Sequence, residues 1–388
     1  MVKKGGLVMA VTLRVKRSSR AAGHAMALLE KAGIALDGPG DGDLQVYDER
    51  FYGRVLRDRE LGLGESYQAG WWGARRVDKF IAKILEVDLA NEIRSSPRLL
   101  AFAALAKVWN RQTLRRAATN ASAHYDIGND LYERMLDRRM VYSCGYWADA
   151  DNLDDAQEAK LQLICDKLKL EPGMHLLDIG CGWGGLAQYA AERYGVRVTG
   201  VSLAAQQVKV ATQRCQGLEV DIKQLDFRHV KGRFDRVVSV GMLEHVGPKN
   251  YQAFFDTSYE LLASDGIALH HTIGSSTTKN HTDPWFDKYI FPAGVIPSLE
   301  QLGAATQGKW VVEDIHNFGP DYDKTLLAWH NNINQVWDEI PRYDEHFRRT
   351  WQYYLLSSAA SFRVRALHLW QIVMRPARRV APVYQAVR

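Results

Sequence analysis

A short apolar run that ends in a glycine-rich turn is the clearest sign of chemistry in this sequence. The run covers residues 175–179, and the turn that follows contains Gly180, Gly182 and Gly185. Glycine lets a backbone turn sharply and approach a ligand closely, because no Cβ stands in the way. The same three glycines match a dinucleotide-binding pattern, although that pattern alone is weak evidence. The turn therefore predicts a cofactor site at the end of a strand.

An acidic residue just before the turn, Asp178, favours S-adenosylmethionine as the cofactor. A carboxylate at this position can lie near the cationic methionine end of that molecule, through water or backbone contacts. A nicotinamide site would instead need an acidic residue about 20 positions further on, to bind the ribose. Residues 199–202 read Thr-Gly-Val-Ser and supply none. An NADP site could tolerate this absence, so a nucleotide oxidoreductase is the alternative at this point.

The elements that must position this turn read as an α/β fold. Short apolar runs alternate with amphipathic segments from about residue 168, which is typical of a parallel sheet with helices on both faces. We predict a doubly wound, Rossmann-like methyltransferase sheet. Its expected strands cover residues 175–179, 196–201, 220–225, 236–240 and 267–271. The C-terminal part adds an apolar run at 310–316, two amphipathic helices between 323 and about 362, and a last apolar run at 367–373.

The first third of the chain reads as several short helices, around residues 25–32, 51–56 and 77–89. We predict a smaller, mainly helical N-terminal domain over residues 1–120 and a catalytic domain over residues 121–388. The adjacent Trp71 and Trp72 are typical of core or domain packing, and a membrane interface is the alternative.

Charge and composition bound the partners. The net charge of +5 is mildly basic, which suits a phospholipid headgroup, a nucleic acid or an acidic cofactor. No RNA-reading motif is present, so we expect no nucleic-acid partner. The four cysteines have no zinc-like spacing, which predicts a reduced, cytoplasmic setting and no metal site. The apolar run at residues 7–13 is too short for an export signal. No apolar stretch approaches the roughly 18 residues that cross a bilayer, so lipid contact would be peripheral.

Seven further segments, taken with the glycine turn, resemble the cyclopropane-fatty-acyl-phospholipid synthases. The resemblance extends over nearly the whole chain. The segments are 124–130 (HYDIGND), 142–147 (YSCGYW), 241–247 (GMLEHVG), 271–274 (HTIG), 283–285 (DPW), 289–292 (YIFP) and 317–322 (NFGPDY). Residues 64–67 (GESY) resemble the branch of the family that acts on phospholipids.

The resemblance implies an activity and a catalytic set. The enzyme would transfer a methylene group from S-adenosylmethionine to the cis double bond of an unsaturated phospholipid acyl chain, with bound bicarbonate as the base. The residues that would hold the bicarbonate are Cys144, Glu244, His271, Ile273 and Tyr322. Histidine, tyrosine and backbone N–H groups can donate to an anion, and a glutamate can accept its proton. Read alone, Cys144 could equally be a small buried side chain, and Glu244 could form a structural ion pair.

The resemblance also implies a cofactor set. Its members are Tyr142, Ser143 and Asp178 at the methionine end, Gly180 and Gly182 beneath it, Ser202 and Gln207 near the ribose, and Asp226 and Phe227 at the adenine. For Gln207 and Asp226, ordinary loop polarity is the alternative.

The implied partner is a phospholipid bilayer, reached from the cytoplasmic side by a homodimer whose N-terminal domain docks on the membrane. Two basic clusters could meet anionic headgroups or form a solvated face: Arg111, Arg115 and Arg116, and Arg375, Arg378 and Arg379. Aromatic and apolar residues within 285–295 could line an acyl channel or form core. Methyl branching of the same lipids is the rival activity, and a membrane- or nucleic-acid-binding protein without catalysis is the non-enzymatic alternative.

Overall fold

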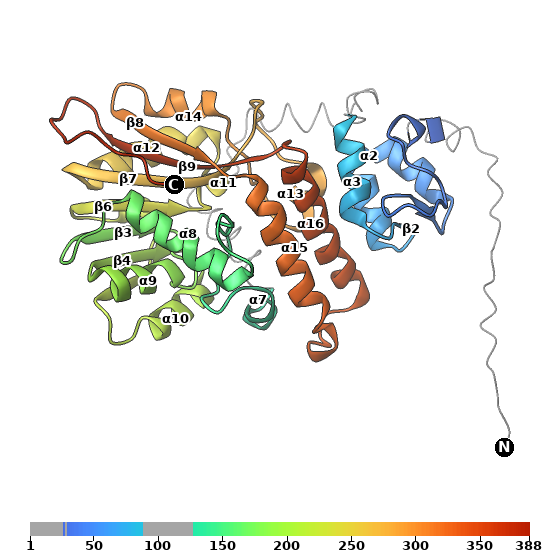
Figure 1. Cartoon of the computed structure of the whole chain (residues 1–388), viewed down its shortest axis with the longest axis horizontal. Helices are drawn as coiled ribbons and strands as arrows, with labels where there is room; N and C mark the ends of the chain where they lie inside the picture. Colours follow the sequence, from blue (N-terminus) through green and yellow to red (C-terminus); the bar gives the residue numbers. More distant parts are fainter. Residues whose placement is uncertain (1–25, 28, 88–126) are drawn as a thin grey trace, which may run out of the picture.

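The largest element of the structure is a mostly parallel sheet. The computed structural model describes residues 26–27, 29–87 and 127–388, and in that part of the chain a seven-stranded sheet has the order β5-β4-β3-β6-β7-β9-β8 (Figure 1). The strands are β3 (His175–Ile179), β4 (Arg197–Ser202), β5 (Val220–Gln224), β6 (Phe234–Val240), β7 (Leu262–Gly274), β8 (Trp310–Asn317) and β9 (His368–Pro376). The first five in this order are mutually parallel, whereas β9 is antiparallel to both β7 and β8.

The five strands expected from the sequence are all present, and the apolar runs near the C-terminus add two more. The predicted strand at 267–271 is longer, because β7 begins at Leu262 and continues to Gly274. The run at 310–316 forms the edge strand β8, which is half exposed along its length. The run at 367–373 becomes β9, which is almost entirely buried because it lies between β7 and β8.

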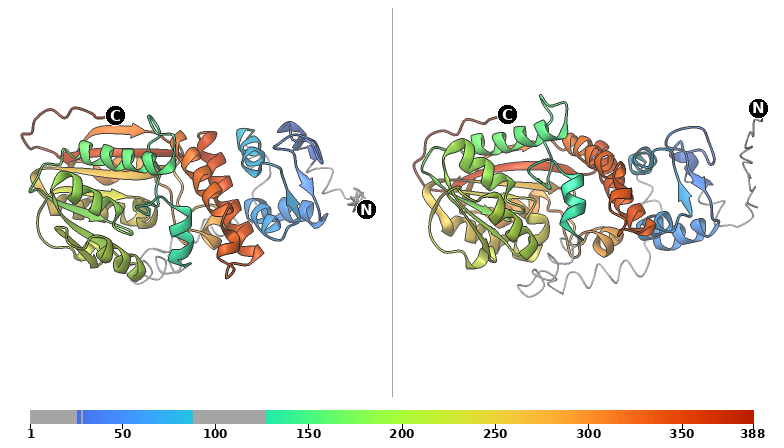
Figure 2. Two further views of the ribbon diagram at one scale, coloured as in Figure 1. Left: turned by 60° about the horizontal axis from the view of Figure 1, so that its bottom comes forward. Right: turned by 90° about the horizontal axis from the view of Figure 1, so that it is seen from below.

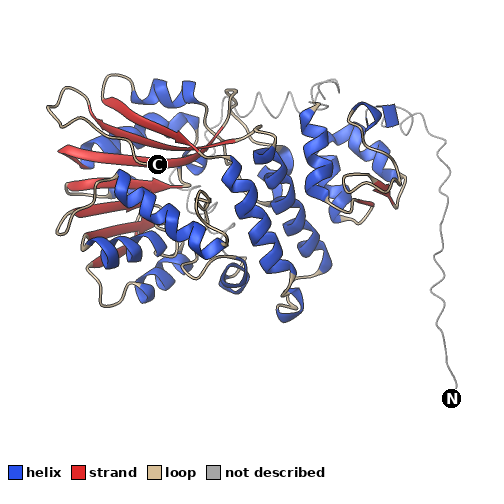
Figure 3. Ribbon diagram, viewed as in Figure 1, coloured by secondary structure: helices blue, strands red, loops and turns tan. Residues whose placement is uncertain are grey.

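Helices cover both faces of the sheet, which confirms the doubly wound fold (Figure 3). One apolar cluster joins the sheet to α8 (Leu153–Lys167) and α9 (Gly185–Tyr194). A second cluster joins the opposite face to α12 (Tyr251–Leu261) and α14 (Leu299–Thr306). Helix α10 (Ala205–Arg214) packs against β4 and β5.

A third cluster ties the two ends of the chain together. Helices α15 (Pro320–Asn334) and α16 (Glu345–Arg363) stand between the sheet and the N-terminal helices, as both views in Figure 2 show. Helix α16 packs against α2 (Arg50–Gln68) and α3 (Val77–Glu86), and the side chains of these helices share one core. The predicted domain boundary near residue 120 lies outside the described residues, as do His124, Tyr125, Arg111, Arg115 and Arg116, so the division at 120 stays a prediction.

The remaining helices, strands and turns of the described residues are short. They are β1 (Gln45–Val46), β2 (Trp72–Gly73), α7 (Asn129–Met135), α11 (Leu243–Val246), α13 (Pro284–Tyr289), and the 3-10 turns η1 (Phe227–His229), η2 (Pro248–Asn250) and η3 (Trp337–Glu339). No helix among residues 26–27, 29–87 and 127–388 combines the length and apolar character needed to cross a bilayer.

The tandem tryptophans belong to the N-terminal core. Trp72 is fully buried, and its ring lies 4.8 Å from that of Phe80 and 5.0 Å from that of Tyr67. Trp71 is half buried, with the Arg50 guanidinium 4.4 Å above its ring. These contacts support packing as the role of both residues.

The segment at residues 64–67 docks α2 against α13. Glu65 accepts hydrogen bonds from Lys288 Nζ at 2.7 Å and from the Tyr289 hydroxyl at 2.9 Å. Gly64 faces the Trp285 indole so closely that a Cβ would overlap the ring. The Trp285 indole N–H also donates to Gln68 Oε1 at 3.1 Å. This part of the sequence therefore holds α13 in place, which explains its residue types.

Adding a methyl group at Gly64 is expected to destabilise the fold. Gly64→Ala would push the new Cβ into the Trp285 indole, and overpacking of this kind costs about 1–3 kcal/mol. Gly53→Ala, at an exposed position of α2 before its kink at Arg59, is the matched control because a Cβ there meets nothing within 4 Å. The control should be neutral or stabilise by up to about 1 kcal/mol. Thermal unfolding of both variants measures the difference, and equal midpoints would contradict this description of the contact.

Candidate active site

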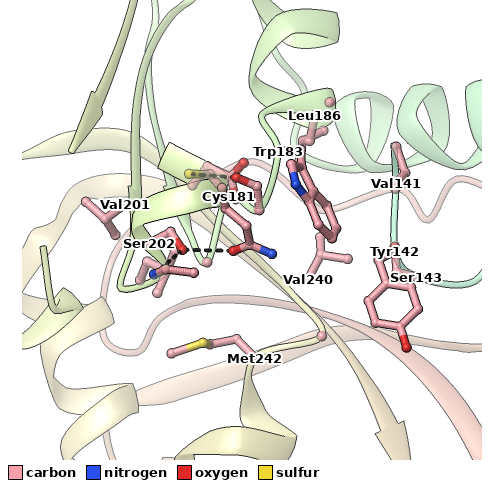
Figure 4. Close-up of a pocket in the computed structure, with 18 of the residues that line it drawn as sticks. Val141, Tyr142, Ser143, Cys181, Trp183, Leu186, Val201, Ser202, Val240 and Met242 are labelled. Carbon is pink, nitrogen blue, oxygen red and sulfur yellow. Dashed lines mark hydrogen bonds between the residues drawn. The ribbon is translucent and has the colours of Figure 1, made fainter. Parts of the chain in front are cut away.

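A cavity opens where the order of the strands reverses. Strand β3 lies between β4 and β6. The chain continues from β3 to β4 and β5 on one side and returns to β6 and β7 on the other side. At such a reversal the carboxyl ends of the adjacent strands border a crevice. The residues that line the cavity come from these strand ends, from helices α8, α9, α10 and α11, and from the segments before α8 and after α13. They are Met140–Ser143, Lys160, Leu161, Asp178–Trp183, Gly185, Leu186, Val201–Ala204, Gln207, Leu225, Phe227, Val240–Met242, His245, Phe291 and Pro292. The wall is mixed, with apolar rings and a few buried polar groups (Figure 4).

The glycine turn forms the floor of this cavity and needs its glycines for two reasons. Gly180, Gly182 and Gly184 have φ values of 87°, 53° and 81°, in the left-handed region that favours glycine. Gly185 has ordinary backbone angles, but a Cβ there would lie 2.7 Å from the Arg139 carbonyl oxygen. The turn thus combines unusual backbone angles with close packing against the segment before α8.

The structure brings most of the predicted cofactor residues to the cavity. Tyr142, Ser143, Asp178, Gly180, Gly182, Ser202, Gln207 and Phe227 all line it. At the end of β4, the Ser202 hydroxyl donates to Gln207 Oε1 at 3.1 Å (Figure 4). Asp226 is buried beside the cavity, but its carboxylate pairs with Arg228 at 2.6 Å and accepts the Arg228 backbone N–H at 3.0 Å. Its contact with adenine stays a prediction.

Lys160 is a cavity residue that the sequence reading missed. It lies on α8, is fully buried, and donates a hydrogen bond from Nζ to the Ser143 hydroxyl at 2.8 Å. Burial lowers the pKa of this lysine to about 8. The available signal was its spacing, because Ala156, Lys160 and Ile164 follow one face of α8 and the first and last are fully buried.

Asp178 is the second buried charge-bearing group in the wall. Burial raises the pKa of its carboxyl to about 7, while the nearby Lys160 acts in the opposite direction. Its Oδ2 atom has no hydrogen-bond partner among the described residues. A buried carboxylate oxygen without a partner is costly, so a ligand with a hydrogen-bond donor would fit this position.

Three of the five predicted catalytic residues lie near the ends of β6 and β7. Glu244 Oε1 accepts the backbone N–H of Ile273 at 2.6 Å. Burial raises the pKa of Glu244 to about 7, and its Oε2 has no partner among the described residues. His271 is buried two residues before Ile273, with Nδ1 lying 3.3 Å from the Gln371 amide nitrogen.

The hydrogen bond to Gln371 decides how His271 can act. In the arrangement in which the Gln371 amide donates to Nδ1, the proton of the neutral ring is on Nε2. Burial, with a smaller effect of Lys160 and Lys167, lowers the pKa of His271 well below its usual value. Its Nε2 has no partner in the described part of the chain. His271 Nε2 and Glu244 Oε2 are thus two buried polar atoms without a partner among the described residues, at the same end of β7.

The other two predicted catalytic residues lie against α15. Cys144 is fully buried, its thiol donates to the Gly145 carbonyl oxygen at 3.1 Å, and burial raises its pKa well above the usual value. Tyr322 is in the first turn of α15, with its ring 4.6 Å from that of Phe362. The Phe318 ring, just before α15, lies 5.8 Å from the His271 ring. None of the five is among the described residues that line the cavity.

Comparison with known proteins now decides the family. Residues 112–372 match the family model for mycolic acid cyclopropane synthetase. A cyclopropane-fatty-acyl-phospholipid synthase of Escherichia coli (strain K12) is 50% identical over 347 residues, which are 89% of this chain and 91% of that protein. The chain belongs to the mycolic acid cyclopropane synthetase family.

Two other similar proteins support this placement. A tuberculostearic acid methyltransferase of Mycobacterium tuberculosis is 32% identical over 347 residues, covering 82% of this chain and 79% of that protein. The crystal structure of a mycolic acid cyclopropane synthase in complex with SAH and CTAB has 31% sequence identity and a TM-score of 0.61, over 66% of this chain and 97% of that one. This member of the mycolic acid cyclopropane synthetase family is therefore an S-adenosylmethionine-dependent methyltransferase, and the oxidoreductase alternative is rejected.

Of the residues proposed for an acyl channel, the structure places some in the core and one at the cavity. Trp285 and Ile290 are buried in the core, and so is Val295. Phe291 instead lines the cavity, where its ring lies 5.8 Å from that of His245. The sequence reading did not assign His245, Trp183 or Met242 to the cavity. All three belong to segments that resemble the family, Trp183 to the glycine turn and Met242 and His245 to residues 241–247, so their position in those segments was the available signal.

The raised pKa of Glu244 predicts a pH-dependent stability. An unfolded glutamate titrates near about 4.3, whereas the folded protein holds this proton up to about pH 7. Between these pH values only the unfolded state loses the proton, so the free energy of unfolding falls as the pH rises. Glu244→Gln should remove this part of the slope. Urea unfolding of both proteins between pH 4.5 and 7 tests it, and parallel curves would contradict the raised pKa. Asp178 contributes equally to both proteins.

Proposed function

We propose that the enzyme transfers a methylene group from S-adenosylmethionine to the cis double bond of unsaturated phospholipid acyl chains and forms a cyclopropane ring. The observation that carries this proposal is the similarity to the Escherichia coli synthase, which is named for that product and matches over nine-tenths of its length.

The reaction places two demands on the protein. An isolated double bond is a weak nucleophile, so the methyl group must be held in line with it, away from water. The double bond attacks the methyl carbon, the carbon–sulfur bond breaks, and a cation forms on the acyl chain. The new methyl group then loses a proton and the ring closes. The enzyme must therefore orient the cofactor and provide a route for one proton.

We propose that Glu244 and His271 serve the proton route by holding a bicarbonate ion. The His271 Nε2–H can donate to an oxyanion, and Glu244 Oε2 can exchange a proton with it, because neither atom has a partner among the described residues. A glutamate with a pKa of about 7 is suited to such exchange near neutral pH. Cys144 would contribute a backbone contact and Tyr322 a hydroxyl, and the Ile273 N–H would hold Glu244 in position. When bound, bicarbonate supplies the base that removes the methyl proton.

Dependence on bicarbonate and on the double bond tests this proposal. We expect release of S-adenosylhomocysteine with vesicles of a cis-monounsaturated phospholipid and none with the saturated analogue. In buffer freed of carbon dioxide, turnover should fall by at least about tenfold and recover when bicarbonate is added. Equal turnover in the two buffers would remove bicarbonate from the mechanism. Equal turnover on the two lipids would exclude the double bond as the acceptor of the methyl group.

We also propose that the enzyme acts as a homodimer bound peripherally to the cytoplasmic face of the membrane, with the N-terminal domain docking it there. The net charge of +5 supports contact with anionic lipid. Arg378 and Arg379 are exposed, whereas Arg375 is half buried and donates to the Pro382 carbonyl oxygen at 2.8 Å.

Methyl branching of an acyl chain is the second candidate function. It is favoured by the similarity to the tuberculostearic acid methyltransferase, which covers 82% of this chain. Methyl transfer would be the same in both reactions, and the fate of the cation would differ. The identity is lower than that with the synthase, 32% against 50%, so we place cyclopropane formation first.

A further inference from the structure

We propose that Lys160 is a cofactor-binding residue that recognises the α-carboxylate of S-adenosylmethionine, on the same cavity wall as Asp178, which is already expected at the methionine end. In this arrangement the Lys160 ammonium binds the α-carboxylate, and the Asp178 carboxylate binds the α-ammonium. The inference rests on the cofactor of the proposed function and is independent of the lipid product.

The position of Lys160 is unusual for a lysine. Its side chain is fully buried and lines the cavity, although removing an ammonium from water is unfavourable unless the charge is matched. Among the described residues its Nζ has one hydrogen-bond partner, the Ser143 hydroxyl at 2.8 Å. An ammonium group carries three donors, so Lys160 can still bind an anionic ligand at this wall.

Among the described residues, the acidic groups near Lys160 do not form an ion pair that would balance its buried positive charge. Asp137 is the first of those that stabilise its charged form, followed by Cys144 and Asp178. The two carboxylate oxygens of Asp137 accept the backbone N–H groups of Val141 and Arg139, both at 2.8 Å. Asp137 therefore serves to fix the segment before α8. The thiol of Cys144 stays protonated because burial raises its pKa well above the usual value.

Asp178 provides the complementary charge on the same wall. It lies near the end of β3, just before the glycine turn, and lines the cavity. Its Oδ2 atom has no partner in the described part of the chain. A lysine and an aspartate that share a cavity without forming an ion pair match the two charges of an α-amino acid. The methionine end of S-adenosylmethionine is the part of the cofactor with this chemistry.

The surrounding contacts hold the pair in place. Gln157, one turn before Lys160 on α8, donates from its amide to the Ser143 carbonyl oxygen at 2.7 Å. The Ser143 hydroxyl and backbone are thus both tied to α8. This rigid contact between α8 and the segment 142–143 is what a site for a small charged group requires.

Binding measurements with two probes test the proposal. S-adenosylhomocysteine carries the amino-acid end, and 5′-methylthioadenosine lacks it. By calorimetry on the full chain, Lys160→Met should weaken S-adenosylhomocysteine by about 10- to 100-fold, the range expected for a lost hydrogen bond between charged groups. The same substitution should leave 5′-methylthioadenosine within about twofold. Equal weakening of both probes, or of neither, would overturn the proposal.

The chain offers a matched control on the same helix. Lys167 is also fully buried on α8, but its Nζ lies 2.9 Å from His316 Nδ1 and it does not line the cavity. Lys167→Met removes an equally buried ammonium and should leave the affinity for both probes within about twofold. A comparable loss of S-adenosylhomocysteine affinity in this control would show that any buried lysine on α8 matters only for structure.

A third probe keeps the proposal testable if Lys160→Met does not fold. The unmodified protein should bind decarboxylated S-adenosylhomocysteine at least tenfold more weakly than S-adenosylhomocysteine itself, and Asp178→Asn should weaken both by a similar factor. Equal affinity of the unmodified protein for the two probes would overturn the role of Lys160. Because no turnover is measured, failure here is distinct from failure of the proposed reaction.

Discussion

Replacing Glu244 with glutamine is expected to lower turnover by about 10²- to 10⁴-fold, the usual contribution of a positioned acid or base. Glutamine has the same shape and can still accept the Ile273 N–H that Glu244 Oε1 accepts at 2.6 Å, so the end of β7 should keep its conformation. It cannot take up or release a proton at the Oε2 position. The change therefore separates proton exchange from structure.

Cofactor binding is the internal control for this variant. Glu244 does not line the cavity in the described structure, so the affinity for S-adenosylhomocysteine should stay within about twofold. Single-turnover measurements at saturating cofactor would show whether the chemical step has slowed. Full turnover in Glu244→Gln would exclude this carboxylate from the proton route.

Replacing His271 with leucine is expected to have a similar effect on turnover, about 10²-fold or more. Leucine fills the buried position but removes the Nε2–H, which has no partner among the described residues. If that N–H holds an anion at the site, its loss should also raise the bicarbonate concentration needed for half-maximal turnover. The measurement is turnover as a function of added bicarbonate.

The preceding residue provides a close control. His270 is equally buried, but it points to the opposite face of β7, where its ring lies 5.1 Å from that of Phe255 and 5.4 Å from that of Phe254. His270→Leu should leave the bicarbonate dependence unchanged. If both variants respond alike to bicarbonate, the effect of His271 is structural and its role in anion binding is lost.

The elements of the fold that could be predicted are those that a local sequence pattern indicates. Each interior parallel strand is a short apolar run, and the glycine turn after β3 has a characteristic composition. The pairing of β9 between β7 and β8 could not be predicted, because two long helices separate β8 from β9 in the chain. The packing of α16 against α2 and α3 also joins opposite ends of the sequence.

The candidate site shows the same limit. Residues that belong to motifs, such as Ser202 and Gln207, are found at the cavity. Lys160 was missed because a charged residue on an amphipathic helix usually faces water, and only its spacing indicates the buried face. The contact between Glu244 and Ile273 joins residues 29 positions apart, so no local pattern reveals that the carboxylate is held by a backbone N–H.

The central claim is the identity of the product, and isotope-labelled product analysis tests it most directly. The full chain would be incubated with vesicles of a cis-monounsaturated phospholipid and S-adenosylmethionine whose transferred methyl group carries three deuterium atoms. Mass spectrometry and NMR of the acyl chains would follow. We predict a cyclopropane ring that retains two of the three deuterium atoms. A methyl-branched alkene that retains all three, formed when the cation loses a proton from the acyl chain, or an exocyclic methylene group that retains two, would contradict cyclopropane formation and favour the rival activity.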